Sequence, residues 1–340
     1  MKKKRAGKTV QAIKPACMGL AVGTVALAAV YTEAVTTLIA RRRSSLASRV
    51  TAQPGKKKDG QLAEECRQIA EAAGQARRLP TEEVSLVNRD GLTLRAHWYH
   101  AAQPKRLLIL VHGWHSTWDR DFGMSMPFYH EHDCELLLIE QRCHGSSEGK
   151  MISYGDRERY DVLGWLDYAQ SAHPELPIYL CGLSMGAATV LLCAGESIAD
   201  RVTAIVADCG YTVPETVVAG RARKQLGRAT DVTLAAVNLN CRLRGGFTLK
   251  SCSTTEAMKK NTSVPVLFIH GDSDELVPCS MSLENYLACA APRELLIVHG
   301  AGHARSFLVD PDTYKSRVLA FFDAWDGRLK HPTDSERSRT

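Results

Sequence analysis

Paired cysteine motifs and repeated apolar runs of membrane-spanning length are both missing from this chain of 340 residues. Its eleven cysteines are scattered singly and no Cys-x-x-Cys occurs, which argues against a zinc site or a redox dithiol. Cys134, Cys181, Cys193 and Cys209 lie in or beside apolar runs and are expected to be small buried residues. Only one stretch is long and apolar enough to span a bilayer, which excludes a polytopic membrane protein.

A basic excess is missing from most of the chain, although the formal net charge is +6. Residues 1–60 hold 13 Lys and Arg and 2 Asp and Glu, whereas residues 61–340 hold 30 basic and 35 acidic residues. The body is therefore mildly acidic, which argues against nucleic acid as a partner. The excess of positive charge lies in the N-terminal tail, and such an excess is typical of a segment close to a membrane.

The apolar run covers residues 16–40, which contain Glu33 as their single charge, between a basic start and Arg41-Arg42-Arg43. An uncleaved membrane helix fits this length and these flanking charges, and the denser N-terminal charge favours a body outside the cytoplasm. A cleaved signal peptide, with Ala26-Leu27-Ala28 as its small-residue site, would instead give a secreted protein. A soluble helix is the third interpretation.

Alternating strands and helices are predicted for the body. Asn88-Arg89-Asp90-Gly91 separates two alternating strands and predicts an antiparallel hairpin. Buried strands alternating with helices predict an α/β fold with a mostly parallel sheet, to which the hairpin adds an antiparallel edge. Buried-strand runs follow at 107–111, 136–139, 178–180, 204–206, 266–269 and 295–298, and helical patterns at 159–169, 187–193 and 313–325.

About fifty-five residues without a strand run separate Asp208 from Val264, and an insertion of this length between core strands is typical of a lid. A helical excursion that only packs is the alternative. The expected organisation is a basic tail (1–15), a membrane or signal segment (16–40), a tether with a lead-in helix (41–80), the α/β domain (81–326) with a cap at about 211–260, and a polar tail (327–340). Since the tether looks flexible, removal of residues 1–60 is expected to leave the chemistry of the body intact.

A nucleophilic serine is predicted at Ser184. The sequence Gly182-Leu183-Ser184-Met185-Gly186 follows a strand and precedes an Ala-rich helix, which is the setting of a nucleophile elbow. The turn is sharp, so a side chain at 182 or 186 would collide with its neighbours. The helix N-terminus favours the negative charge that develops there during a nucleophilic attack.

An acid and a base follow Ser184 in the order that this strand–turn–helix setting requires. Asp274 comes just after one strand run and His303 just after the next. Asp272 competes with Asp274 for the role of the acid, and His299 competes less well with His303 because His303 lies in a Gly-rich loop.

Two backbone N–H groups are expected to bind the oxyanion. One belongs to Met185, directly after the serine. The other belongs to Trp114, in the loop that begins His112-Gly113-Trp114. His112 itself is expected to be a structural hydrogen-bonding residue.

The chain resembles the α/β-hydrolase superfamily, in particular serine aminopeptidase-like hydrolases and bacterial membrane-associated esterases. The resemblance covers residues 82–325 and rests on His112-Gly113, on 141–149, on 182–186, on 271–274 and on Gly302-His303. Relatives usually carry Asp where this chain has Glu140, a position taken as structural. The resemblance implies that residues 141–149 shape the rim of the site, and a catalytic role for Arg142 or His144 is the minority interpretation.

A serine hydrolase acting on a small-molecule ester through an acyl-enzyme is therefore the leading hypothesis, with no metal or organic cofactor. Thioesterase or peptidase activity is the alternative, because the same residues serve all three reactions. A lyase or haloperoxidase on this fold, and a non-catalytic binding module, are less favoured because serine, acid and histidine are all present.

Overall fold

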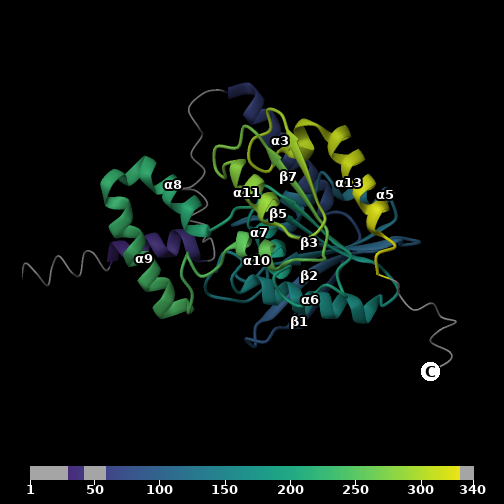
Figure 1. Ribbon diagram of the computed structural model, residues 1–340, viewed down its shortest axis with the longest axis horizontal. Coiled ribbons are helices and arrows are strands. Elements are labelled where there is room, and N and C mark those ends of the chain that lie inside the picture. Colours follow the sequence, from purple (N-terminus) through teal and green to yellow (C-terminus); the bar gives the residue numbers. More distant parts are fainter. Residues whose placement is uncertain (1–29, 42–58, 330–340) are drawn as a thin grey trace, which may run out of the picture.

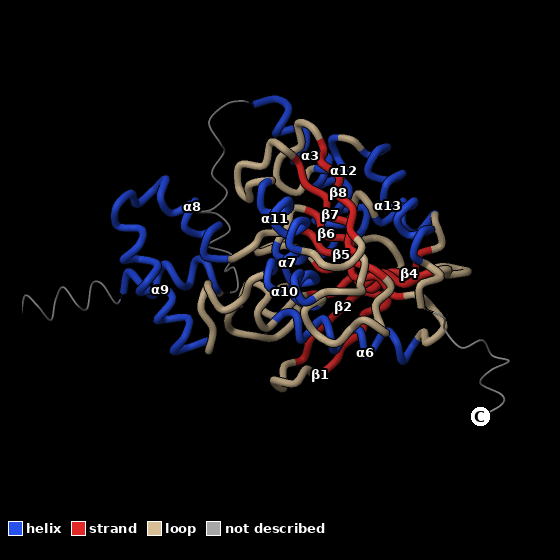
Figure 2. Tube along the Cα trace, in the orientation of Figure 1, coloured by secondary structure: helices blue, strands red, loops and turns tan. Residues whose placement is uncertain are grey.

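One eight-stranded sheet organises the computed structural model, which describes residues 30–41 and 59–329 (Figures 1 and 2). The strand order is β1-β2-β4-β3-β5-β6-β7-β8; β1, β2 and β4 pair antiparallel and all other neighbours pair parallel. The strands are β1 (Glu82–Val87), β2 (Thr93–Tyr99), β3 (Arg106–Val111), β4 (Cys134–Glu140), β5 (Ile178–Leu183), β6 (Ala204–Asp208), β7 (Val266–Gly271) and β8 (Arg293–Val298).

Helices cover both faces of the sheet because successive residues of each central strand point to opposite sides. In β3, Leu107 and Ile109 pack towards α6, α7 and α10, whereas Leu108 and Leu110 pack towards α4, α5 and α13. The helices are α3 (Asp59–Ala76), α4 (Trp118–Phe122), α5 (Met126–Glu131), α6 (Glu158–Ala172), α7 (Met185–Cys193), α8 (Pro214–Leu226), α9 (Thr230–Gly245), α10 (Thr254–Lys260), α11 (Ser280–Ala288), α12 (Ser306–Val309) and α13 (Pro311–Trp325), with a 3-10 turn at Gly227–Ala229.

The strand runs and the hairpin expected from the sequence are all present, and their ends move by three residues at most. The two buried cores explain why continuous apolar runs identified the central strands: both faces of these strands are covered, so neither face needs polar residues. The described cysteines form no disulfide, and most of them are buried.

The long insertion after β6 forms α8, the 3-10 turn, α9 and α10. Helices α8 and α9 stand at one end of the molecule, beyond the edge of the helical layer (Figure 1). We call residues 211–260 the cap. The cap follows β6 directly, so its root lies beside the carboxyl ends of the parallel strands.

Residues 30–40 are helical and lie against α9 in the structure (Figure 1). Thr36 and Ala40 are fully buried there. No helix within 30–41 or 59–329 has the length and apolar character needed to cross a bilayer. Most of the predicted membrane or signal segment, residues 16–29, lies outside the described residues, as do most of the tether and the polar tail.

Candidate active site

Ser184 occupies a strained turn between β5 and α7. Its φ of 56° and ψ of −113° lie outside the regions that residues with a side chain prefer. A Cβ at position 186 would overlap the carbonyl of Val111 at the end of β3, and a Cβ at position 182 would overlap the carbonyl of Gly186. The two glycines therefore allow the turn to be tight enough to lift the serine above the sheet.

The structure brings Ser184, His303 and Asp274 together in one hydrogen-bonded relay. His303 Nε2 lies 2.8 Å from Ser184 Oγ, and His303 Nδ1 lies 2.6 Å from Asp274 Oδ2. The three residues come from the ends of β5, β7 and β8, which meet at one edge of the sheet because these strands are parallel. This arrangement can move a proton from the serine to the imidazole while the carboxylate holds the ring.

Asp274 has an almost complete set of hydrogen-bond donors. Its Oδ1 accepts from the N–H groups of Leu276 and Val277 at 2.8 and 2.9 Å, and its Oδ2 lies 3.2 Å from His270 Nε2. Burial alone would raise the pKa of Asp274, but hydrogen bonds from His270 and His303 outweigh it and hold the pKa well below its usual range. Asp274 is therefore ionised and can accept the hydrogen bond from His303 Nδ1.

Asp272, the competing acid, lies elsewhere. Its carboxylate contacts His299 and accepts the N–H of Gly300 at 2.8 Å. The hydrogen bond from Gly300 lowers the pKa of Asp272, so the residue behaves as an exposed turn-capping carboxylate. His299 is almost fully exposed. Neither residue contacts the serine relay.

The loop after β3 faces the nucleophile. A Cβ at Gly113 would lie 3.3 Å from the Cβ of Ser184, so the loop passes directly beside the serine. The Gly113 N–H donates to Asp121 Oδ2 at 2.6 Å, and the His115 N–H donates to His144 Nε2 at 3.0 Å. The N–H of Trp114, between them, donates to no described residue. Together with the N–H of Met185 at the start of α7, it is available for a ligand.

The rim residues of the 141–149 segment have structural partners. Arg142 forms a two-pronged ion pair with Asp161, and Glu140 accepts the Ser146 N–H and lies 3.1 Å from His97 Nε2. His112 is fully buried between Gly113 O and the N–H of Gln141. These contacts agree with the structural roles expected for Glu140 and His112, and the Arg142 guanidinium is taken up by Asp161 and Asp90.

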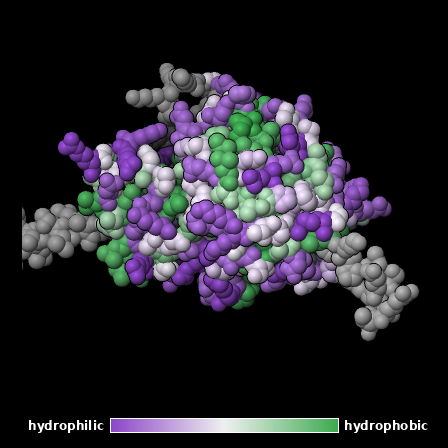
Figure 3. Space-filling view, viewed as in Figure 1, coloured by the Kyte–Doolittle hydropathy of each residue, from purple (hydrophilic) through white to green (hydrophobic). Residues whose placement is uncertain are grey.

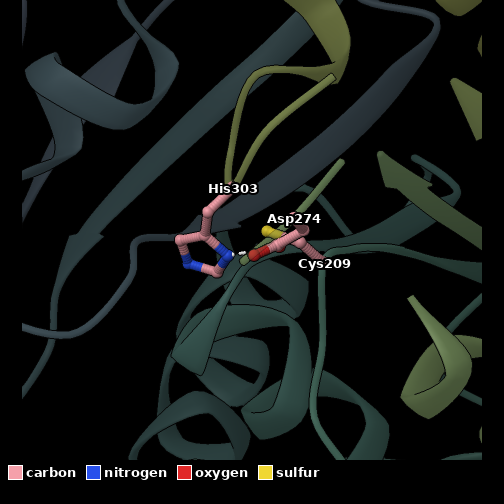
Figure 4. Close-up of side chains that lie close together, drawn as sticks. All are labelled: Cys209, Asp274 and His303. Carbon is pink, nitrogen blue, oxygen red and sulfur yellow. Dashed lines mark hydrogen bonds and ion pairs between the residues drawn. The ribbon is translucent and has the colours of Figure 1, made fainter. Parts of the chain in front are cut away.

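Cys209, Asp274 and His303 lie close enough for their ligand atoms to surround an ion (Figure 4). The chemistry does not fit a resident metal. Asp274 Oδ2 and His303 Nδ1 already bond to each other and His303 Nε2 bonds to Ser184, so these ligand atoms have partners within the relay. Burial raises the pKa of the Cys209 thiol well above its usual value. Cys209 is therefore a packing residue beneath the relay.

Sequence reasoning missed several residues that support the site. Asp208 O accepts the Ser184 N–H at 2.8 Å, and burial raises the pKa of the Asp208 carboxyl to about 6. His270 supports Asp274, and Asp121 and His144 hold the loop of Trp114. Asp208 and His270 were visible as polar residues just after apolar strand runs, whereas Asp121 gave no such signal.

Two families of known proteins match this chain. The family described as Serine aminopeptidase, S33 matches residues 102–230, and the family described as Serine hydrolase (FSH1) matches residues 204–304. Together the two matches contain Ser184, Asp274 and the loop of Trp114, and the second ends just beyond His303. The chain belongs to the α/β-hydrolase superfamily.

Relatives of this α/β-hydrolase match it over part of their length. Protein YqkD of Bacillus subtilis (strain 168) is 32% identical over 190 residues, which cover 55% of this chain and 62% of the relative. Human monoglyceride lipase is 33% identical over 116 residues, which cover 33% of this chain and 37% of the relative.

Solved structures share the fold. An esterase of Pyrococcus furiosus, Pf2001, superimposes with a TM-score of 0.61 and 22% identity, covering 74% of this chain and 94% of its own. Est1E of Butyrivibrio proteoclasticus, solved with ferulic acid, gives a TM-score of 0.54 and 21% identity, covering 71% of this chain and 98% of its own. The α/β-hydrolase fold expected from the sequence, with its mostly parallel sheet and antiparallel edge, is confirmed.

The two neighbouring carboxylates give a paired test of the relay. We expect Asp274→Asn to lower turnover of an ester by about 10⁴-fold, because the imidazole of His303 is then held in the wrong tautomer. Asp272→Asn, its matched control, should retain turnover because the described partners of the Asp272 carboxylate are His299, Gly300 and Ser273, none of which belongs to the relay. Steady-state kinetics on both purified variants, with circular dichroism to verify folding, provides the measurement. A larger loss in the Asp272 variant would assign the acid to the other carboxylate.

Proposed function

We propose that this chain is a serine hydrolase that cleaves a carboxylic ester through an acyl-enzyme. The observation that carries the proposal is the continuous relay from Ser184 Oγ through His303 to Asp274, with separations of 2.8 and 2.6 Å. A serine is a weak nucleophile unless a base is within hydrogen-bond reach and is itself oriented by a third group. Both conditions are met here, by three residues that follow the ends of different strands.

In the acylation step, Ser184 Oγ attacks the ester carbonyl carbon while His303 Nε2 takes the hydroxyl proton. Asp274 stabilises the resulting imidazolium and keeps its own charge. The negative oxygen of the tetrahedral intermediate accepts hydrogen bonds from the N–H groups of Met185 and Trp114. Removal of one such donor typically costs about 3 kcal/mol in the transition state.

Collapse of the intermediate breaks the bond to the alcohol, which leaves with the proton from His303. Water then attacks the acyl-enzyme, with His303 as the base once more, and releases the acid and free Ser184. The reaction so described needs no metal or organic cofactor.

The names of two similar proteins support an ester substrate over the alternatives. Human monoglyceride lipase and the Pyrococcus esterase are both named for ester cleavage. Thioester or amide cleavage by the same relay is the second candidate, and it is supported by the match to the family described as serine aminopeptidase. A lyase or haloperoxidase and a non-catalytic binding module have no comparable support among the described contacts.

We propose that the cap selects the acyl group. One buried apolar cluster joins Met185, the residue after the nucleophile, to the cap residues Leu234, Val237 and Phe247. Val217 of α8 packs against this cluster, whereas Leu239 of α9 is 59% exposed. An aliphatic chain attached to the reacting carbonyl would meet the cluster. Leu239 does not belong to the cluster.

Membrane association through the N-terminal segment is also a proposal, with the hydrolase domain outside the cytoplasm or, after signal cleavage, secreted. The apolar, uncharged sequence of residues 16–29 supports it. Val30 and Tyr31, where the described chain begins, are exposed apolar residues, and α9 exposes two more, Val232 and Leu243. In the space-filling view, apolar surface interrupts the hydrophilic surface at this end of the molecule (Figure 3).

Replacement of the nucleophile tests the reaction class. Ser184→Ala should remove labelling by a fluorophosphonate probe, because the probe forms its bond with the activated oxygen. The variant should also lose nearly all ester turnover and keep only the ~10³–10⁴-fold residual advantage over water that binding and oxyanion donors supply. Gel fluorescence of the labelled protein and hydrolysis of p-nitrophenyl acetate are the measurements. A wild-type chain that is never labelled would favour the binding module.

Enlarging one cap residue tests acyl selection. Val217→Phe should lower kcat/KM for long-chain p-nitrophenyl esters by about tenfold or more, because one or two methylene groups in an apolar site are worth 1–3 kcal/mol. Acetate ester turnover should be retained. Leu239→Phe enlarges an exposed side chain in the same way, and we expect it to change neither kcat/KM for long-chain esters nor turnover of the acetate ester. Equal losses for all chain lengths in the Val217 variant would contradict acyl selection by α8.

Extraction from membranes tests the attachment. The full chain should sediment with membranes, resist 1 M salt and be released by detergent, because salt screens surface charge but not an apolar contact. Release by salt alone would show that only the basic tail holds the protein at the membrane surface. Sequencing of the mature N-terminus distinguishes the two remaining cases, since a start near Val30 identifies a cleaved signal peptide.

A further inference from the structure

The helical residues 30–40 are attached to the cap by polar contacts. Glu33 accepts hydrogen bonds from Asn240 at 3.0 Å and Arg244 at 3.1 Å, both on α9, and lies 2.8 Å from Arg41 in its own segment. Asn240 also donates to Thr36 Oγ1 at 3.0 Å. Glu33, the one charge in the long apolar run, therefore has its partners within the protein.

The end of this segment is attached to the rim of the active site. Three successive backbone groups take part. The carbonyl of Ile39 accepts from Trp114 Nε1 at 2.9 Å and from the Tyr154 hydroxyl at 2.6 Å. The carbonyl of Ala40 accepts from the Ile152 N–H at 2.7 Å, and the carbonyl of Arg41 lies 2.9 Å from His115 Nε2.

Burial accompanies these hydrogen bonds. Ala40 has no exposed surface and belongs to the same apolar cluster as Met185, while Val35 and Ile39 pack against that cluster. The Trp114 ring stacks on His115, with ring centroids 4.1 Å apart. Two neighbouring side chains of the loop after β3 are thus held on the backbone of a segment more than seventy residues away in sequence.

That loop carries the proposed oxyanion donor. Asp121 accepts the N–H of Gly113 and His144 accepts the N–H of His115, so these two contacts hold the backbone on either side of Trp114. The orientation of the peptide between them also depends on where the Trp114 side chain is held. The contact that holds it comes from Ile39.

We infer that residues 33–41 are a positioning segment, which fixes the Trp114 peptide so that its N–H points at the oxyanion. The inference rests on the proposed function for its catalytic consequence. It differs from the expectation that the N-terminal 60 residues are separate from the active site. The segment makes no contact with the reacting atoms and acts through Trp114 and His115.

Charge reversal at Glu33 in the full chain is the test. Glu33→Lys removes the contacts to Asn240 and Arg244 and should loosen the segment. The control is Glu71→Lys, which reverses an exposed glutamate on α3 whose partner is Arg67. The double variant Glu33→Lys with Arg244→Glu restores an opposite-charge pair and provides the rescue.

We expect Glu33→Lys to lower kcat for p-nitrophenyl acetate by about ten- to a hundredfold with little change in KM, because displaced oxyanion donors weaken the transition state more than substrate binding. Trp114→Phe, which keeps the backbone N–H but loses the bond to Ile39, should show the same pattern. Glu71→Lys should match wild type, and the double variant should recover part of kcat. Melting temperatures above the assay temperature would exclude simple unfolding.

Amide hydrogen exchange of the peptide containing residues 113–117 provides a readout that needs no activity. Exchange should quicken in Glu33→Lys and not in Glu71→Lys. Unchanged exchange and unchanged kcat in Glu33→Lys and Trp114→Phe would overturn the inference, as would a change in KM alone. If the wild-type chain hydrolyses no ester, the proposed function fails, while the exchange data still decide whether the segment holds the loop.

Discussion

The close approach of the first turn of α7 to the end of β3 is the constraint on which the site depends. Gly186 lies against the Val111 carbonyl with no room for a side chain, and Gly113 passes beside Ser184. The strained backbone of Ser184 costs about 1–3 kcal/mol in folding free energy. Two features offset this cost: the complete burial of α7, and the hydrogen bond from the Ser184 N–H to the Asp208 carbonyl. The same approach places the loop of Trp114, the proposed second oxyanion donor, directly beside Ser184.

Oxyanion donors contribute most to catalysis when they are held in place before the charge develops, because reorganising them during the reaction costs free energy that offsets the stabilisation of the transition state. In this chain the holding groups come from three separate regions. Asp121 comes from α4, His144 from the rim segment, and the carbonyls of Ile39 and Arg41 from the N-terminal segment. The loop after β3 is short, so side chains from elsewhere must provide its rigidity.

The sequence predicted those parts of the structure that rest on local patterns. Central strands were recognisable because burial on both faces demands continuous apolar runs, and Ser184, Asp274 and His303 because each follows such a run in a fixed order. The groups that orient them were harder to find. Asp121 acts through the fold of a five-residue helix, and Ile39 acts through its backbone carbonyl, which has no sequence signature. The choice of Asp274 over Asp272 rested on position; the contacts to His270 and His303 supply its physical reason.

The docking of residues 30–40 also limits how the N-terminus can meet a membrane. With these residues on the cap, the apolar run that is left comprises residues 16–29. Even as a continuous helix, fourteen residues extend about 21 Å, which is short of a hydrocarbon core of about 30 Å. A complete span would need part of residues 30–40, and these carry Glu33 with its partners on α9 and the carbonyls that hold Trp114. If the N-terminus spans a membrane as proposed, that span would draw on the same residues that hold the side chain of Trp114.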